Sequence, residues 1–500
     1  MKASSVNSLL GRFAGMVSVL TVAGCSLQPA YDKASFAPPS AFKDQAPLPA
    51  QESGSWKAAE PSEALERGLW WTVFNDAVLN DLEHQAMQQN QNLHVAVARL
   101  KQARALNQSA QAGLFPSLDA GFSPTRQRLS PASQSPSQSD RGNGAQQTLW
   151  RAQGGVSYEV DLFGRVASTV EAADAETQRS EALLRSVQLS VQADVAQNYF
   201  VLRQLDAEIQ VFADAVRLRE QALELVGRQF ELGDISALDV ARAESELAIA
   251  RSEALSVQRR RAGAEHSLAV LLGKTPEQFS LPSKPLAVVD ILIPAGLPSS
   301  LLERRPDIAA AERSMAAANA RIGMAKAAFF PALNLTGAAG FESGSLGNLF
   351  QWSSRTFLLG PLVGTALNVP IFDGGLRKGN LANAKALYEQ EVALYREQVL
   401  VAFQEVEDGL SDLRILRVQT EEQDRAVDAS SRASSIARSQ YTEGNVIYLA
   451  VIDAERTALQ SRRLAVQLRG VQATATVNLI RALGGGWEDQ PSLAGVPSAQ

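Results

Sequence analysis

The sequence predicts an α+β membrane protein whose two similar halves each combine a hairpin of transmembrane strands with very long helices. Three observations support this prediction: recurring motifs, long helical stretches without Gly or Pro, and segments that alternate apolar and polar residues. The motifs recur at an offset of about 210 residues, which indicates an internal duplication. The matched segments are 114–116 with 329–331, 161–164 with 370–374, 230–233 with 441–444, and 272–273 with 483–484.

The N-terminus predicts export. Residues 1–24 have the features of a signal peptide, because Lys2 and Arg12 supply positive charge around a short apolar run at 13–22. That run is too short to cross a bilayer as a helix. We therefore expect removal of residues 1–24.

Cys25 is the only cysteine of the chain, and Val22-Ala23-Gly24-Cys25 resembles the bacterial lipoprotein cleavage box. The resemblance implies acylation of Cys25, for example with palmitate, and Ser26 in place of an aspartate implies sorting to the outer membrane. An ordinary buried cysteine is the alternative. With one cysteine, no disulfide can form within the chain, so packing alone must stabilise the fold.

The two halves predict helices of unusual length. Residues 165–226 contain neither Gly nor Pro, and their apolar residues recur at steps of three and four. A helix over 165–232 would be roughly 100 Å long. The remaining predicted helices are 76–113 and 238–272 in the first half, and 302–329, 375–444 and 447–483 in the second.

Each half also contains a segment with the period of a β-strand. Over 150–162 the even positions are mostly apolar and the odd positions mostly polar, and Leu118, Ala120 and Phe122 continue the pattern in the preceding strand. The second hairpin is predicted at 332–341 and 357–371. Strands of about ten residues joined by long polar connections are typical of a transmembrane barrel, although a half-buried soluble hairpin would show the same alternation.

Four strands cannot close a barrel, and an open sheet edge is not tolerated in lipid. Several copies must therefore contribute strands. Two copies would give eight strands and an interior filled by side chains, whereas three would give twelve strands and leave a lumen. A homotrimer is expected if the protein conducts.

Several motifs together resemble the outer membrane factor family, the TolC- and OprM-like exit ducts of tripartite efflux pumps, in its lipoprotein branch. The resemblance covers about residues 70–485. It rests on Trp70-Trp71 with Phe74, Asp76 and Leu79, on 303–308 (Glu-Arg-Arg-Pro-Asp-Ile), on the two Phe-Pro strand entries, on 161–165 (Asp-Leu-Phe-Gly-Arg), and on the turns around Gly233, Ser236, Leu238 and Asp239 and around Tyr441 and Gly444.

The resemblance implies a homotrimer with a twelve-stranded β-barrel that continues into a periplasmic α-helical barrel. It also implies as partners a periplasmic adaptor protein, an inner-membrane transporter of the RND type, and outer membrane lipid. The expected segments are an extended N-terminal part (25–68), two repeats (69–284 and 301–486), an equatorial linker (285–300) and a C-terminal tail (487–500).

Two groups of residues are predicted to matter for function. The turns after the long helices, with Gly233, Asp234 and Ser236 and with Gly444 and Asn445, are expected to dock the adaptor, and their polar residues to cap the following helices. Asp239 and Asp453 are expected at the start of the shorter helices, and the resemblance implies that these acids, with Tyr441 close by, lie at the periplasmic constriction. Val446 and Ala450 replace an Arg and an Asp of some relatives, so a salt-bridged latch is not expected at those positions.

The chain offers no coherent catalytic or metal site. His84 and His94 would lie on different helix faces, His266 stands alone, and the equivalent acids Glu244 and Glu455 lack a convergent histidine. The net charge of −6 without a basic block argues against nucleic acid as a partner. The sequence thus predicts a passive exit duct for small toxic compounds, with no enzymatic activity and no cofactor beyond the lipid. A non-conducting coiled-coil adaptor or scaffold lipoprotein is the alternative.

Overall fold

The computed structural model describes residues 27–31, 43, 69–128, 146–287, 304–359, 367–369 and 371–485. The predicted signal peptide, Cys25 and the C-terminal tail 487–500 lie outside these ranges. The described residues divide into two compact units, one drawn from 1–34, 101–179 and 312–394, the other from 35–100, 180–311 and 395–500.

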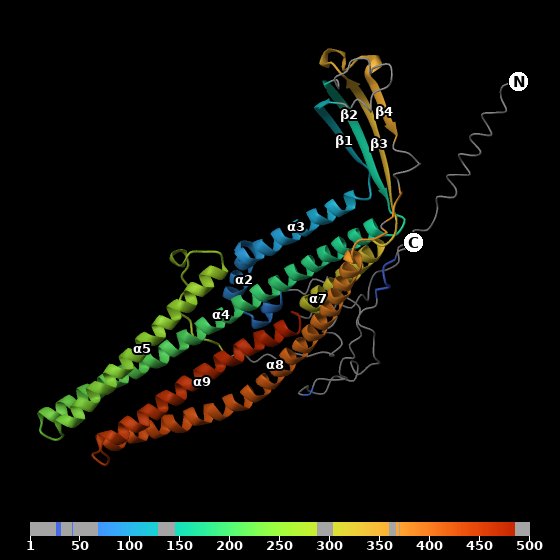
Figure 1. The fold of residues 1–500 in the computed structure, drawn as a ribbon. Coiled ribbons are helices and arrows are strands. Elements are labelled where there is room, and N and C mark those ends of the chain that lie inside the picture. Colours follow the sequence, from blue (N-terminus) through green and yellow to red (C-terminus); the bar gives the residue numbers. More distant parts are fainter. Residues whose placement is uncertain are drawn as a thin grey trace, which may run out of the picture. The chain divides into compact units, whose positions relative to one another are not determined.

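The same order of elements occurs twice along the chain, as Figure 1 shows. The first repeat contains α2 (Ala77–Gln89), α3 (Gln91–Ala112), β1 (Ser117–Arg128), β2 (Gln146–Val160), α4 (Arg165–Glu231) and α5 (Ala237–Leu271). The second contains α7 (Pro306–Ala327), β3 (Ala332–Ser343), β4 (Arg355–Leu359), β5 (Leu367–Asn368), α8 (Leu376–Thr442) and α9 (Tyr448–Ala482). The predicted duplication is therefore present in the structure.

The long helices end within a few residues of their predicted bounds. α4 and α8 each have 67 residues, and α5 and α9 each have 35. No described helix has an apolar stretch that would let it cross a membrane.

One predicted helix is interrupted, and one predicted strand is described only in part. The helix expected over 76–113 breaks at Asn90, which has an extended backbone. Its side-chain amide donates to the carbonyl of Leu271 (2.8 Å), and its side-chain oxygen accepts from the N–H of Leu93 (3.1 Å), so Asn90 caps the start of α3. The strand expected over 357–371 is described only as β4 and β5.

The first unit contains an antiparallel sheet in the order β1-β2-β3-β4, in which β5 also pairs with β3. The pairing of β2 with β3 joins the two repeats, with Val156 opposite Gly337. Among the described residues, no strand pairs with the outer edge of β1 or of β4.

The helices of the second unit share one large apolar core. Trp70 and Trp71 lie in it, and the Trp70 indole donates to the Gln192 side chain (3.0 Å). Asp76 caps α2 by accepting from the N–H groups of Val78 (2.9 Å) and Leu79 (3.3 Å). The Trp-Trp motif with Asp76 therefore anchors the first repeat and starts its first α-helix.

Arg305 is the corresponding anchor of the second repeat. Pro306 is the first residue of α7, a position that suits proline, and Asp307 lies in the first turn of the helix. The buried Arg305 guanidinium pairs with Asp307 (2.6 Å) and Glu405 (2.5 Å) and donates to the carbonyl of Ala482 (3.0 Å). Arg305 thus connects the start of α7 to α8 and α9. Its N–H groups are used in these structural contacts.

Candidate functional site

The sheet has one apolar face that runs across three strands. Leu118 lies opposite Val156, which in turn lies opposite Gly337. On the same face, the Phe122 ring stacks on Trp150 with 5.8 Å between ring centroids. Leu118 and Phe122 are 83% and 57% exposed in the single chain, so this face needs an apolar environment outside the chain.

The other face of the sheet is polar. Arg151 of β2 and Glu342 of β3 lie directly opposite each other and form an ion pair of 2.6 Å across the junction of the two repeats. The hydroxyls of Ser117 and Ser157 lie 2.8 Å apart on this face. The alternation predicted from the sequence is therefore confirmed as two chemically distinct faces.

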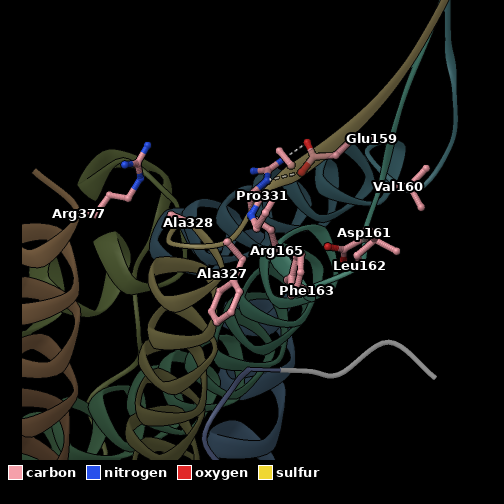
Figure 2. A pocket seen from close by; sticks show the side chains of 12 residues that line it. Glu159, Val160, Asp161, Leu162, Phe163, Arg165, Ala327, Ala328, Pro331 and Arg377 are labelled. Carbon is pink, nitrogen blue, oxygen red and sulfur yellow. Dashed lines mark hydrogen bonds and ion pairs between the residues drawn. The ribbon is translucent and has the colours of Figure 1, made fainter. Parts of the chain in front are cut away.

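The Asp-Leu-Phe-Gly motif makes the junction between β2 and α4 (Figure 2). The Asp161 carboxylate accepts from the N–H of Ala167 (2.7 Å) at the start of α4, and Gly164 has a positive φ of 74°. The Phe163 ring stacks on Phe330 of the second repeat, with 4.8 Å between centroids. Arg165 forms an ion pair of 2.5 Å with Glu159. The motif thus turns the chain sharply and fixes the two repeats together.

The described part of the N-terminal segment, residues 27–31, is held against the same unit. Gln28 donates to Glu171 (2.8 Å), Asn319 donates to the carbonyl of Pro29 (3.0 Å), and the Tyr31 hydroxyl donates to Glu312 (2.6 Å). Gly323 faces this segment, because a Cβ there would lie 2.8 Å from the Gln28 Cβ. Residues 28–31 therefore have a defined position on α4 and α7.

Both long helices end in the same hydrogen-bonded turn. Gly233 and Gly444 have φ values of 84° and 77°. After α4, the N–H of Gly233 donates to the carbonyl of Phe230 (2.9 Å), and that of Asp234 to Gln229 (3.0 Å). The N–H groups of Gly444 and Asn445 repeat these bonds after α8. This is a Schellman motif, in which glycine is favoured at the left-handed position.

The polar residues of these turns do not cap the following helices as predicted. Ser236 is the N-cap of α5, but its hydroxyl donates to the Asp239 carboxylate (3.0 Å). Asp234 makes no cap, and Asn445 donates to Glu443 (3.1 Å), while the N-cap of α9 is Ile447. The Ser236 and Asn445 side chains therefore bond to nearby carboxylates and not to the N–H groups that begin α5 and α9.

Apolar side chains are exposed around both turns. Leu232 is 76% exposed and Ile447 is 70% exposed, while Leu238 is 58% exposed. Behind them, Val226, Ala243, Tyr448 and neighbouring residues form a small core that joins α4, α5 and α9. The two turns of one chain therefore share a packed base and present apolar side chains outward.

Two of the predicted constriction residues lie close together. The Tyr441 hydroxyl donates to the Gln229 side-chain carbonyl (2.6 Å), and its ring lies 5.5 Å from that of Tyr448. Burial, and then the negative charge of Asp239, raise the pKa of Tyr441 above its ordinary value. Asp239 itself pairs with Arg242 (3.4 Å).

Asp453 differs from the prediction. Asp239 lies in the first turn of α5, but α9 begins at Tyr448, so Asp453 lies beyond the first turn of its helix. The Asp453 side chain is exposed, and its negative charge helps to raise the pKa of Arg456. The favourable interaction with a helix N-terminus therefore applies to Asp239 alone.

A buried ionic cluster near the turns was not predicted. Glu246 of α5 is 5% exposed and pairs with Arg219 of α4 (3.2 Å) and with Arg456 of α9, whose Nε donates at 3.0 Å. Burial, then the charge of Glu455, raise the pKa of nearby Tyr448 to about 12. One feature of the sequence could have indicated this cluster: the acidic residue Glu246 lies on the same buried side of α5 as Ala243 and Leu247.

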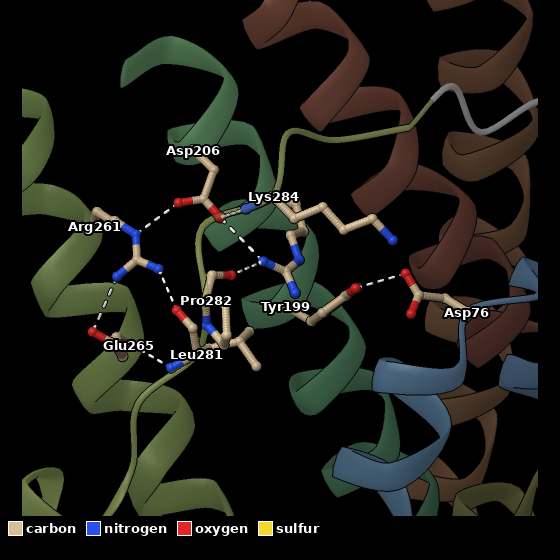
Figure 3. A network of polar contacts seen from close by, with 9 residues as sticks. Asp76, Tyr199, Asp206, Arg261, Glu265, Leu281, Pro282 and Lys284 are labelled. Atoms are coloured by element: carbon tan, nitrogen blue, oxygen red, sulfur yellow. Dashed lines mark hydrogen bonds and ion pairs between the residues drawn. The ribbon is translucent and has the colours of Figure 1, made fainter. Parts of the chain in front are cut away.

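A second network of hydrogen bonds and ion pairs holds residues 281–284, which follow α5 (Figure 3). The buried Asp206 carboxylate accepts from Arg203 (3.1 Å), Arg261 (2.6 Å) and the N–H of Lys284 (3.0 Å). Arg203 and Arg261 also donate to the carbonyls of Pro282 and Leu281, both at 2.7 Å. Residues 281–284, the end of the first repeat, therefore have a defined position.

Tyr199 connects this region to the start of α2. Its hydroxyl donates to the Asp76 carboxylate (2.6 Å). Burial alone would raise the pKa of Asp76, but the bond from Tyr199, followed by those from two backbone N–H groups, holds that pKa below its ordinary value. Asp76 is thus stabilised as an anion.

One exposed apolar face on a sheet and paired helices of 67 residues define the class of protein as an outer-membrane channel. The family model of the outer membrane efflux protein matches residues 82–274 and 297–485. The chain belongs to this family and is an outer-membrane exit channel of an efflux pump, with a helical extension in the periplasm.

Curated relatives and a solved structure agree with this assignment. The chain is 36% identical to the antibiotic efflux pump outer membrane protein ArpC of Pseudomonas putida, over 96% of both chains. It is also 36% identical to the toluene efflux pump outer membrane protein TtgC, likewise from Pseudomonas putida and again over 96% of both. The open state of the MtrE outer membrane channel of Neisseria gonorrhoeae superposes with a TM-score of 0.78 at 29% identity, covering 92% of this chain and 98% of that one. The predicted family and fold class are confirmed.

Proposed function

We propose that three copies of the chain form a passive duct through which an efflux pump discharges small toxic compounds. The open edges of β1 and β4 carry this proposal, because unpaired backbone groups in lipid cost several kcal/mol each. With four strands per chain, as the sequence predicts, three copies supply twelve strands and leave a lumen. The duct catalyses no reaction and needs no cofactor.

The oligomer is tested by native mass spectrometry of the detergent-purified protein. A trimer is expected. Bifunctional cross-linking between Thr125→Cys on β1 and Thr356→Cys on β4 should occur between chains, because these strands lie at opposite edges of one sheet. A monomeric protein would contradict the proposal. So would the absence of cross-linked chains when both cysteines are present.

The partners follow from the same role. A periplasmic adaptor and an inner-membrane transporter of the RND type would deliver the compounds to the duct. The names of ArpC and TtgC mention antibiotics and toluene, which supports small drugs and apolar solvents as the substrate class. Resistance to such compounds is the expected phenotype.

The adaptor would dock at the two Schellman turns. The exposed Leu232 and Ile447 support this assignment, because exposed apolar side chains on a packed base are typical of interaction sites. Leu232→Glu and Ile447→Glu should abolish drug resistance while the trimer persists. Gly233→Val and Gly444→Val should have the same effect, because valine does not adopt the positive φ of these two positions. Gly227→Ala inside α4 is the matched control. Full resistance with all four turn variants would refute docking there.

The lipid anchor on Cys25 fits the position of residues 27–31. Three residues span at most about 11 Å, so Cys25 lies within that distance of Gln28. Gln28 contacts the first turns of α4, which begins directly after the β2 junction. The acyl chains would therefore start close to the end of the transmembrane strands.

Lipidation is tested by Cys25→Ser, with a cleavable signal peptide that needs no acylation. Palmitate labelling should disappear, while the trimer should still insert through its apolar face. A soluble monomer would contradict the barrel, and unchanged labelling would contradict the anchor.

Closure of the duct would rest on contacts between the repeats. Tyr441 with Gln229, and Arg456 with Glu246, each join α8 or α9 to the first repeat near the turns. Both would have to loosen when the second repeat moves outward. The alternative function, a non-conducting scaffold, predicts no pore in any variant.

A further inference from the structure

A small pocket lies between three helices of the second unit. Its lining comes from α4, α8 and α9, and its volume is about 160 Å³. Known sites for drug-sized ligands are about 300–1,000 Å³, so this pocket has room for a small molecule only. The lining residues are Val211, Ala215, Leu218, Arg219, Ser431, Ser434, Ser435, Arg438, Glu455, Ala458, Leu459 and Arg462.

The lining is positively charged. It contains the three guanidinium groups of Arg219, Arg438 and Arg462 against the single carboxylate of Glu455. Arg438 pairs with Glu455 (2.9 Å), and Arg219 is committed to Glu246 outside the pocket (3.2 Å). Arg462 donates only to the neutral Ser431 hydroxyl (3.1 Å), and it has no acidic partner in the part of the chain that the structure describes.

Ser434 provides a second donor at the pocket. Its side chain is 6% exposed and lines the pocket, yet its hydroxyl forms no hydrogen bond with the residues that the structure describes. The neighbouring Ser435 differs, because its hydroxyl donates to the carbonyl of Arg432 (2.8 Å). Among the described residues, the fully buried side-chain atoms without a partner do not include the Ser434 oxygen, so it is open to the pocket and can donate to an occupant.

The rest of the lining is apolar. Val211, Ala215 and Leu218 come from α4, and Ala458 and Leu459 come from α9. A ligand that matches both parts carries one anionic oxygen group on a short aliphatic stem. We propose that this pocket binds short aliphatic carboxylates, with Arg462 and Ser434 as donors to the carboxylate. This site goes beyond the proposed duct function and requires no adaptor or transporter.

The probe is butyrate, titrated into the purified trimer by saturation-transfer NMR and calorimetry. Saturable binding is expected. Arg462→Gln should weaken it about tenfold or more, and Ser434→Ala about threefold to tenfold, because each removes a hydrogen bond to a charged group. Arg432→Gln is the matched control, since Arg432 is exposed on the same turn of α8 but does not line the pocket.

Two isosteric probes separate this site from nonspecific partitioning. Butylammonium should not bind saturably, and 1-butanol should bind at least about tenfold more weakly than butyrate. Native mass spectrometry confirms that every variant is a folded trimer. The proposal is overturned if wild-type protein shows no saturable butyrate binding, if butanol binds equally well, or if Arg432→Gln and Arg462→Gln lose the same affinity.

Discussion

The Tyr441 hydroxyl at the end of α8 donates a hydrogen bond of 2.6 Å to the side-chain carbonyl of Gln229 near the end of α4. The contact therefore links the long helices of the two repeats. Phe230 occupies the position of the first repeat that corresponds to Tyr441, and it cannot donate. The second repeat therefore donates a hydrogen bond to the first at this position, and the first repeat has no equivalent hydroxyl to donate in return.

Removing this hydroxyl should loosen the turns without unfolding the chain. Tyr441→Phe deletes one hydrogen bond, which contributes about 0.5–1.5 kcal/mol. We expect nearly unchanged trimer stability but a higher open probability in planar bilayers. Tyr388→Phe, on the same helix and far from the turn, is the control. Equal open probability in all three proteins would show that the bond has no part in closure.

The Glu246 cluster should contribute more to stability than the bond between Tyr441 and Gln229. Glu246→Ala leaves the buried Arg219 without its partner, which costs about 3–5 kcal/mol. Glu244→Ala, two residues earlier and exposed, should change the free energy of unfolding by less than about 0.5 kcal/mol. Thermal unfolding of the trimer measures both. Similar melting temperatures for the two variants would contradict the assigned importance of the cluster.

The two faces of β2 should tolerate charge very differently. Val156→Arg places a cation on the apolar face and should cost about 2–4 kcal/mol near the bilayer midplane, whereas Ser157→Arg on the polar face should cost little. Reversible folding into lipid vesicles gives both values. Equal costs would mean that the apolar face does not contact lipid.

Glu83 should make stability depend on pH. Burial raises its pKa to about 9, and neither carboxyl oxygen has a hydrogen-bond partner among the residues that the structure describes. An unfolded glutamate titrates near about 4.3, so the folded protein holds a proton that the unfolded chain releases, and stability falls as pH rises from about 4.3 to about 9.

Glu83→Gln removes this proton linkage. The variant should match wild type near pH 4 and be more stable by about 1 kcal/mol or more at pH 8. Denaturant unfolding at both pH values measures the difference, and the exposed Asp81→Asn is the control. A gain of the same size at pH 4 and pH 8 would rule out titration of Glu83 as its cause.

The fold could be predicted from the sequence where local periodicity and the repeat agreed. A long stretch without Gly or Pro located α4, the repeat located α8, and alternation located β2 and β3. The break at Asn90 was missed because it depends on the carbonyl of Leu271, far away in sequence. The strand predicted over 357–371 is described at both of its ends, as β4 and β5.

The site was predictable only in part. Gly233 and Gly444 were identified because a positive φ at a helix end favours glycine. The capping roles of Ser236 and Asn445 were wrong, because their side chains bond to nearby carboxylates instead. The Glu246 cluster was missed because its partners come from three helices, whose packing single-sequence patterns do not specify.

Single-channel recording in planar bilayers tests the account most directly, because a continuous duct must conduct. Purified wild-type trimer should give discrete ion-conducting steps, and Tyr441→Phe combined with Arg456→Ala should give larger or longer openings. If neither protein conducts at any voltage, although both are inserted as trimers, the protein is not an exit duct.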